Sequence, residues 1–215
     1  MLDGIHTAWL AMSGWEVAAV LLSLLYLVLA IRQNALCWYA AFASTAIFTV
    51  LFWDVSLLME SALNAYYLVM AVYGWLLWRR GSSDQPQRPI VRWQWRQHLI
   101  ALVLIGTLSL ISGGLLSEHT QAAMPYLDSI TTWGAVVTTW MVARKVLENW
   151  LYWLVIDALS VYLFLERGLM LTAVLFMIYE VMVLFGLWRW WRDYQAQNAE
   201  PHALDVDALP SGAKG

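Results

Sequence analysis

The chain has 215 residues, of which 61% are hydrophobic and 13% charged, and its formal net charge is −3. Soluble domains are about half apolar and about a quarter charged, so this composition indicates a protein dissolved in lipid. The small negative net charge gives no basis for nucleic-acid binding. The single cysteine, Cys37, cannot form an internal disulfide, and the four His are scattered. The sequence therefore predicts neither a metal site nor a cofactor.

Seven apolar segments are long enough to cross a bilayer, which takes about 20 helical residues. They cover residues 15–31, 35–53, 57–78, 97–116, 125–143, 146–165 and 168–190. We therefore expect an all-α membrane protein with seven transmembrane helices. Residues 1–14 precede the first span, 79–96 form a long basic loop, and 193–215 form a hydrophilic tail that we expect to be disordered.

The positive charges predict the orientation of the chain. Of the 12 Lys and Arg, all but Arg167 follow the first, third, fifth or seventh segment, and they therefore fall on one side of the membrane. The side that carries the excess of Lys and Arg is normally the cytoplasmic side. We therefore predict an N-terminus outside the cell and a C-terminus in the cytoplasm.

The sequence contains an internal correspondence, because a shift of 112 residues places 16–80 on 128–192. The coinciding residues are of uncommon types: Arg32/Arg144, Trp38/Trp150, Tyr67/Tyr179, Gly74/Gly186, Trp78/Trp190 and Arg80/Arg192. The alternative explanation is that Trp and Arg recur wherever membrane helices end. We interpret the pattern as a duplication. It predicts two parallel three-helix repeats, 15–78 and 125–192, joined by a linker helix at 97–116, with a central cleft between the repeats.

The sixth segment carries polar groups on one face. Asn149, Trp153, Asp157 and Ser160 are spaced three or four residues apart, and Trp150 joins the edge of this stripe. An unpaired charge at mid-membrane costs on the order of 3 kcal/mol, so Asp157 should face the bundle interior. Indole faces attract cations and stack on flat rings. This face suits a flat, positively charged solute, and the alternative is a polar contact that holds two helices together.

Two other segments add polar groups. Asn64 and Tyr67 lie one turn apart in the third segment and could supply an amide and a hydroxyl to the same cleft. Glu180 in the seventh is either a binding carboxylate or the partner of an interior donor, and Glu148 beside Lys145 predicts an ion pair at the cytoplasmic mouth. No catalytic set is expected. The candidate substrate-binding residues are Asn64, Tyr67, Asn149, Trp150, Trp153, Asp157 and Glu180.

Several stretches together resemble one family of membrane carriers. They are NAYYLVMAVYGWLLW (64–78), PYLDS (125–129), RKVLENWLYWLVIDALSVYLF (144–164) and GLMLTAVLFMIY (168–179). They resemble the nicotinamide riboside transporter family, PnuC, from about residue 16 to 192. The resemblance implies a fold similar to SWEET sugar carriers, a trimer, and facilitated diffusion of an NAD precursor across the bacterial inner membrane, with trapping by a cytoplasmic kinase. It also implies that Trp150 and Trp153 contact the pyridinium ring and that Asn149 is the amide of the motif.

The sequence departs from this family in ways that bear on the substrate. Asp157 stands where some carriers of nicotinamide riboside have Asn, and Asn64 where some have Gln. Relatives carry thiamine, riboflavin or deoxynucleosides, and thiamine is also a flat cation, so we rank nicotinamide riboside first and thiamine second. A retinal protein would need a lysine within 168–190, where none occurs, and an intramembrane enzyme would need a nucleophile with its base. A proton-coupled carrier stays open, because an intramembrane carboxylate can relay protons.

Overall fold

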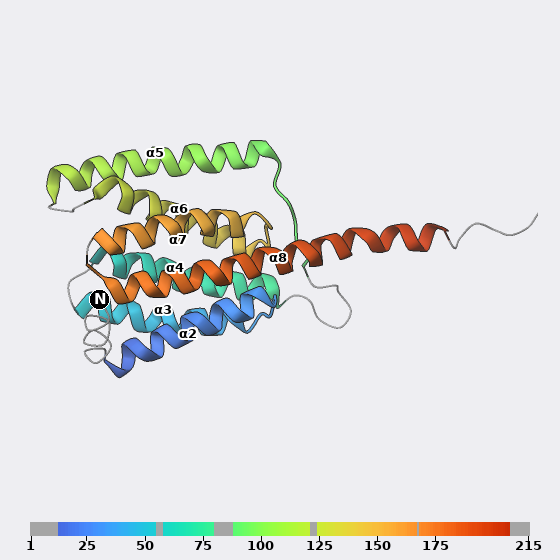
Figure 1. Ribbon diagram of the computed structural model, residues 1–215, viewed down its shortest axis with the longest axis horizontal. Helices are drawn as coiled ribbons and strands as arrows, with labels where there is room; N and C mark the ends of the chain where they lie inside the picture. Colours follow the sequence, from blue (N-terminus) through green and yellow to red (C-terminus); the bar gives the residue numbers. More distant parts are fainter. Residues whose placement is uncertain (1–12, 55–57, 80–87, 121–123, 167, 207–215) are drawn as a thin grey trace, which may run out of the picture.

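The computed structural model describes residues 13–54, 58–79, 88–120, 124–166 and 168–206. Within these ranges the chain forms seven helices that run lengthwise in one bundle (Figure 1). They are α2 (Gly14–Ile31), α3 (Cys37–Asp54), α4 (Leu58–Trp78), α5 (Trp95–His119), α6 (Pro125–Ala143), α7 (Asn149–Glu166) and α8 (Met170–Val206). The prediction of seven helices is therefore confirmed, with bounds that differ by a few residues at most ends.

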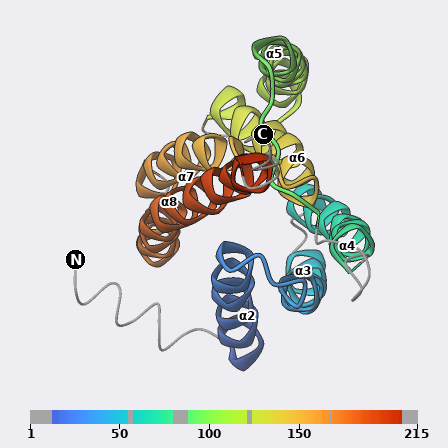
Figure 2. The same cartoon turned by 90° about the vertical axis from the view of Figure 1, so that its right-hand side faces the viewer.

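The helices form two groups with one helix outside them. Helices α2, α3 and α4 pack in chain order, as do α6, α7 and α8, and the groups meet where α4 packs on α6 and α2 on α8. Viewed along the bundle, α5 lies at the periphery (Figure 2). Among the described helices it packs on α6 alone. The two groups are therefore the part of the fold that can enclose a solute.

The helices differ in how much apolar surface they expose. Three of the described helices, α2, α5 and α8 over Met170–Ala199, are long and apolar enough to cross a membrane on length and composition alone. Helix α5 exposes a broad apolar surface that includes Leu99, Ile100, Val103, Leu110 and Ile111. The helices between them carry buried polar side chains, among them Ser44, Thr138, Thr139 and Asp157. These helices therefore direct polar side chains into the bundle interior.

The two groups share local backbone geometry at the turns that join α2 to α3 and α6 to α7. Gln33 and Lys145 both have a left-handed φ, of 54° and 55°. The next residue of each turn, Asn34 or Val146, donates its N–H five residues back, at 2.9 Å and 3.0 Å respectively. Each pair is separated by 112 residues, so the correspondence found in the sequence extends to the backbone of both turns. This agreement supports the predicted repeats, although the repeat–linker–repeat plan stays a prediction.

An aromatic core lies at the end of the bundle that carries these two turns, which we call the turn end. Trp38 packs edge-on against Trp78, with ring centroids 5.4 Å apart at 84°, and Trp150 packs on Trp190 with the same distance and angle. Edge-to-face packing of this kind is favourable for aromatic rings. Trp78 and Trp190 approach each other at 6.2 Å and so connect the two groups.

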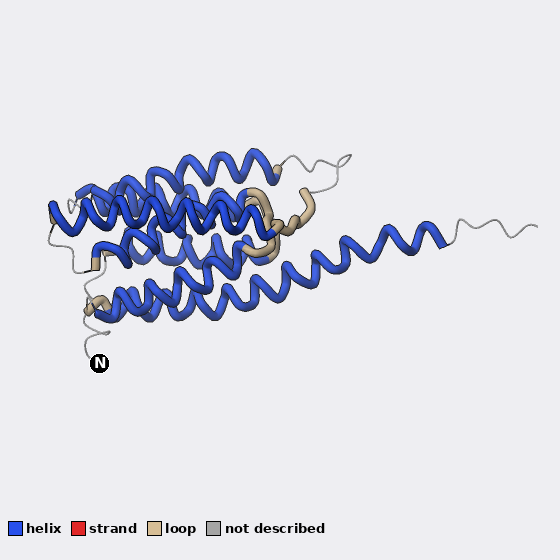
Figure 3. The backbone as a smooth tube through the Cα atoms, turned by 90° about the horizontal axis from the view of Figure 1, so that it is seen from above, coloured by secondary structure: helices blue, strands red, loops and turns tan. Residues whose placement is uncertain are grey.

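The predicted disorder of residues 193–215 is wrong as far as Val206, because α8 continues beyond the bundle (Figure 3). Residues 193–200 include good helix formers and neither glycine nor proline, so nothing in them ends the helix before Pro201. Its first part is also anchored. The Asp193 carboxylate accepts a hydrogen bond from Gln33 at 2.7 Å, and the Gln197 side chain accepts one from the backbone of Ile90 at 3.1 Å. Residues 207–215 lie outside the described residues.

Candidate functional site

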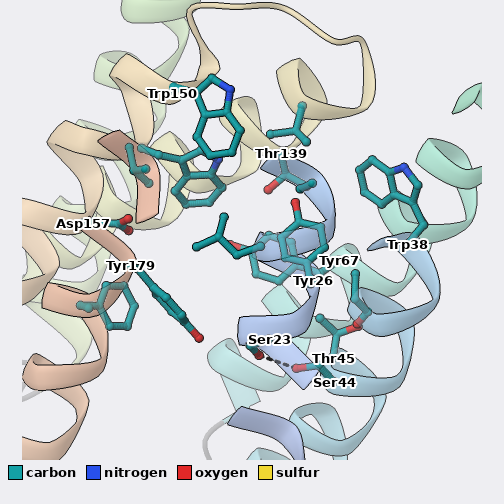
Figure 4. Close-up of a pocket in the computed structure, with 17 residues that line it drawn as sticks. Ser23, Tyr26, Trp38, Ser44, Thr45, Tyr67, Thr139, Trp150, Asp157 and Tyr179 are labelled. Atoms are coloured by element: carbon teal, nitrogen blue, oxygen red, sulfur yellow. Dashed lines mark hydrogen bonds between the residues drawn. The ribbon is translucent and has the colours of Figure 1, made fainter. Parts of the chain in front are cut away.

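A cavity of about 240 Å³ opens between the two helix groups. Helices α2, α3, α4, α6, α7 and α8 all contribute to its wall, and α5 does not (Figure 4). Apolar and aromatic side chains dominate the lining, with a few polar groups among them. The lining includes Ser23, Trp38, Ser44, Thr45, Tyr67, Trp150, Trp153, Asp157 and Tyr179. A largely apolar cavity with a few convergent polar groups is the usual form of a small-molecule site.

Two indoles related by the 112-residue correspondence form part of the wall. Trp38 and Trp150 are 2% and 1% exposed, and each lies flat against a glycine of a neighbouring helix. A Cβ on Gly74 would lie 2.3 Å from the Trp38 ring, and one on Gly186 would lie 2.4 Å from the Trp150 ring. Such contacts are too short for any side chain. The glycines therefore decide where both indoles stand, which explains why glycine recurs at both positions.

The second helix group supplies the one acidic side chain among the residues that line the cavity. Asp157 lies in the middle of α7, is 4% exposed, and lines the cavity beside Trp150 and Trp153. Among the described residues its carboxylate makes no hydrogen bond and no ion pair. A buried charge without a partner is unfavourable in a medium of low polarity. A cationic solute in the cavity would supply the missing partner.

The first helix group supplies hydroxyls instead. Ser23 of α2 and Ser44 of α3 lie 2.6 Å apart, and both oxygens are within hydrogen-bond distance of the Ala19 carbonyl. Thr45 follows on α3 and donates to the Ala41 carbonyl at 2.7 Å. These side chains lie across the cavity from Asp157 (Figure 4). The cavity is therefore acidic on one side and hydroxyl-rich on the other.

The structure brings part of the predicted site together. Tyr67, Trp150, Trp153 and Asp157 line the cavity, whereas Asn64, Asn149 and Glu180 are not in its wall. Asn149 is the first residue of α7, is fully buried, and uses its amide to donate to the Val146 carbonyl at 2.6 Å. Asn64 is also buried, on α4.

Glu180 directly follows Tyr179, so the helical turn of about 100° per residue directs it away from the cavity face. One of its carboxylate oxygens, Oε2, is buried without a hydrogen-bond partner among the described residues. Glu180 is therefore not part of the cavity wall.

Sequence reasoning missed most of the cavity wall. Trp38 and Tyr179 are the residues that the 112-residue shift places on Trp150 and Tyr67, so the repeat could have found them. Ser23, Ser44 and Thr45 gave no such signal, because isolated hydroxyls in apolar helices commonly bond their own backbone. Within the described part of the chain, no group of three or more His, Cys, Asp or Glu could hold a metal ion.

The turn end is closed by hydrogen bonds that cross between the groups. The indole N–H of Trp78 donates to the Ala143 carbonyl at 3.0 Å, and that of Trp190 donates to the Ala30 carbonyl at 3.1 Å. The ammonium of Lys145, 2% exposed, donates to the Gln33 side chain at 3.1 Å. Both groups must separate here before a solute could leave the cavity through the turn end.

Charge at the turn end is distributed differently from the prediction. Glu148 pairs with Arg92, Oε1 to Nε at 2.8 Å, and not with Lys145, so that prediction is wrong. The reason is that residues 88–94 fold back along the α6–α7 turn, where Val91 bonds the backbone of Lys145 and Leu147. The hydrogen bond to Glu148 raises the pKa of Arg92. Burial lowers the pKa of Lys145 to about 8.

Known membrane transporters resemble this chain in both sequence and fold. Residues 13–192 match the family described as nicotinamide mononucleotide transporters. The chain belongs to this family of membrane transporters. The resemblance to PnuC carriers inferred from the sequence is thereby confirmed.

Individual relatives differ in what they carry. The riboflavin/roseoflavin transporter RibM of Streptomyces davaonensis is 26% identical over 191 residues, which is 86% of each chain. The nicotinamide riboside transporter PnuC of Escherichia coli is 21% identical over 202 residues, covering 81% of this chain and 84% of the relative. The crystal structure of the vitamin B3 transporter PnuC superposes with a TM-score of 0.68 and 18% identity, over 91% of this chain and 90% of that chain. This likeness shows that the fold is shared.

Proposed function

We propose that the chain carries a flat, positively charged vitamin precursor across the bacterial inner membrane, with nicotinamide riboside as the first candidate. The observation that carries this proposal is the unpartnered Asp157 carboxylate in an otherwise aromatic and apolar cavity. A neutral solute would leave that carboxylate without a counter-charge. A pyridinium ring supplies both the flat surface and the charge.

The proposed ring position is beside Asp157, against the indoles of Trp150 and Trp153. A cation over an indole face gains about 2 kcal/mol when both are removed from water. Tyr67 and Tyr179 reach the same space from α4 and α8, and Figure 4 draws both within the cavity. The two helix groups would thus hold the solute jointly, which a carrier requires if their relative movement is to release it.

The proposed transport is facilitated diffusion by small rocking of one helix group against the other. The positive charges at the turn end support its assignment to the cytoplasmic side, with the N-terminus outside. The crossed Trp78 and Trp190 hydrogen bonds then close the cytoplasmic exit in this conformation. A cytoplasmic kinase that phosphorylates the solute would trap it, and assembly as a trimer is part of the same proposal.

Two alternatives have specific support. The Streptomyces relative is a riboflavin/roseoflavin transporter, which favours a flavin. Thiamine is a flat cation and would satisfy Asp157 equally well. Proton coupling through Asp157 is a further alternative to facilitated diffusion. It predicts that uptake stops when the pH gradient is dissipated.

The test is a titration of the purified protein with nicotinamide riboside, thiamine and riboflavin, followed by the quenching of tryptophan fluorescence. We expect saturable quenching by nicotinamide riboside, with the strongest affinity of the three. Asp157→Asn should weaken binding of both cations and leave riboflavin unaffected. Preferential binding of riboflavin, with no effect of Asp157→Asn, would replace the proposed substrate with a flavin.

A further inference from the structure

Three hydroxyl side chains converge on the cavity wall opposite Asp157. They are Ser23 of α2 and Ser44 and Thr45 of α3, which we call the hydroxyl cluster. Ser44 is 2% exposed in spite of its polar group. Figure 4 shows the cluster across the cavity from Asp157, with the Tyr179 hydroxyl directed toward Ser23. The cavity wall opposite Asp157 thus carries several polar groups.

The hydroxyl cluster offers acceptors and lacks free donors. The two protons of Ser23 and Ser44 are used within the triangle that they form with the Ala19 carbonyl, at 2.6 Å, 2.9 Å and 3.0 Å. The Thr45 hydroxyl donates its proton to the Ala41 carbonyl, with the two oxygens 2.7 Å apart. A hydroxyl that has donated its proton still has lone pairs that accept hydrogen bonds. A solute group that fits here must therefore bring donors of its own.

The same scaffold positions carry opposite chemistry in the two helix groups. The 112-residue shift places Thr45 on Asp157 and Ala41 on Trp153, whereas Trp38 and Trp150 are identical. The frame of the cavity is therefore matched, but one side has an acid and an additional indole and the other has hydroxyls. A cationic ring belongs beside Asp157. Neutral donors such as alcohol groups belong beside Thr45.

We propose that the hydroxyl cluster binds the hydroxyl-bearing sugar or polyol portion of the solute while the ring lies against Trp150, Trp153 and Asp157. The inference rests on the proposed function and deepens it. It fixes the direction in which the solute lies in the cavity, with the ring beside Asp157 and the hydroxylated portion beside Thr45. Thr45 is a specificity-determining residue in this assignment.

The test compares two ligands that share a ring. Nicotinamide riboside carries the ribose, and 1-methylnicotinamide presents the same pyridinium with a methyl group instead. Calorimetry on purified protein measures both affinities in wild type, in Thr45→Val and in the matched control Thr49→Val. Thr49 lies one turn further along α3 and donates to the Thr45 carbonyl at 2.7 Å, as Thr45 does to Ala41, but it is not part of the cavity wall.

We expect Thr45→Val to weaken nicotinamide riboside about fivefold, the effect of one neutral hydrogen bond. Its affinity for 1-methylnicotinamide should be unchanged, and Thr49→Val should change neither. Equal loss for both ligands, or no loss for the riboside, would overturn the subsite while leaving the proposed function intact. A wild-type protein that binds neither pyridinium ligand would overturn the proposed function itself, and the subsite with it. Ser44→Ala removes the neighbouring hydroxyl and should likewise weaken nicotinamide riboside without changing the affinity for 1-methylnicotinamide.

Discussion

The turn end and the cavity use the same kinds of side chain in opposite ways. At the turn end the indoles of Trp78 and Trp190 both donate hydrogen bonds, and the charge of Lys145 has a partner in Gln33. In the cavity the indole N–H groups of Trp38 and Trp150 are buried without a hydrogen-bond partner among the described residues. Asp157 likewise makes no hydrogen bond or ion pair there.

This difference separates residues that hold the fold together from residues kept ready for a solute. Buried polar groups are normally satisfied, and those that are not call for an explanation. Trp78, Trp190 and Lys145 join the two helix groups through their hydrogen bonds. Trp38, Trp150 and Asp157 line the space between the groups. Changes in the cavity should therefore impair binding or transport, whereas changes at the turn end should act on stability.

The largest effect is expected from Gly186→Ala. The added Cβ would meet the Trp150 ring at 2.4 Å, so the indole must leave the cavity wall. We expect transport by reconstituted protein to be lost and stability to fall by about 1 to 3 kcal/mol, as is typical of overpacking. Gly106→Ala on α5 is the control, because its Cβ would meet nothing within 4 Å. Full transport by Gly186→Ala would show that Trp150 has no fixed role.

Removal of the second cavity indole should weaken binding without disturbing the fold. Trp153→Ala is expected to lower affinity for nicotinamide riboside about 30-fold, the equivalent of about 2 kcal/mol of cation–π interaction. Trp188→Ala is the comparison, since Trp188 is 58% exposed on α8 and lies outside the cavity. Calorimetry gives both affinities. Wild-type affinity in Trp153→Ala would remove this residue from the site.

A set of four Trp→Phe variants sharpens the comparison between the regions. Trp78→Phe and Trp190→Phe each remove one hydrogen bond to a backbone carbonyl, at a cost of about 1 kcal/mol. Trp38→Phe and Trp150→Phe make the same change of side chain, but they remove no hydrogen bond, because these indole N–H groups have no partner among the described residues. In detergent, Trp78→Phe and Trp190→Phe should therefore unfold at lower temperatures than Trp38→Phe and Trp150→Phe. The reverse order would contradict the assignment of the turn end to stability.

The smallest effect concerns pH. Burial lowers the pKa of Lys145 to about 8 from its ordinary value of 10.5, so between these values the unfolded chain binds more protons than the folded one. The free energy of unfolding should therefore rise with pH between these two values, and the deprotonation of Lys145 causes this rise. Lys145→Met should flatten the rise when unfolding temperatures are compared between pH 7 and pH 10. An unchanged profile would mean that Lys145 stays protonated throughout.

Much of the fold follows from the sequence, because a spanning segment must satisfy its backbone hydrogen bonds within the protein, and apolar segments of about 20 residues do so as helices. The 112-residue shift also identified both members of each tryptophan and glycine pair. The extent of α8 was not predictable from polarity alone, since contacts of Asp193 and Gln197 with distant residues stabilise it. Spacing on α7 grouped Asn149 with Asp157, but Asn149 is held at the α6–α7 turn by Val146.

The most direct test of the proposed site is the charge selectivity of binding. Nicotinic acid riboside has the shape of nicotinamide riboside, but a carboxylate replaces its amide and cancels the ring charge. Calorimetry should show that wild-type protein strongly prefers nicotinamide riboside and that Asp157→Asn loses most of this preference. A preference that is the same in Asp157→Asn would show that this carboxylate does not meet the charge of the solute, contrary to the central claim.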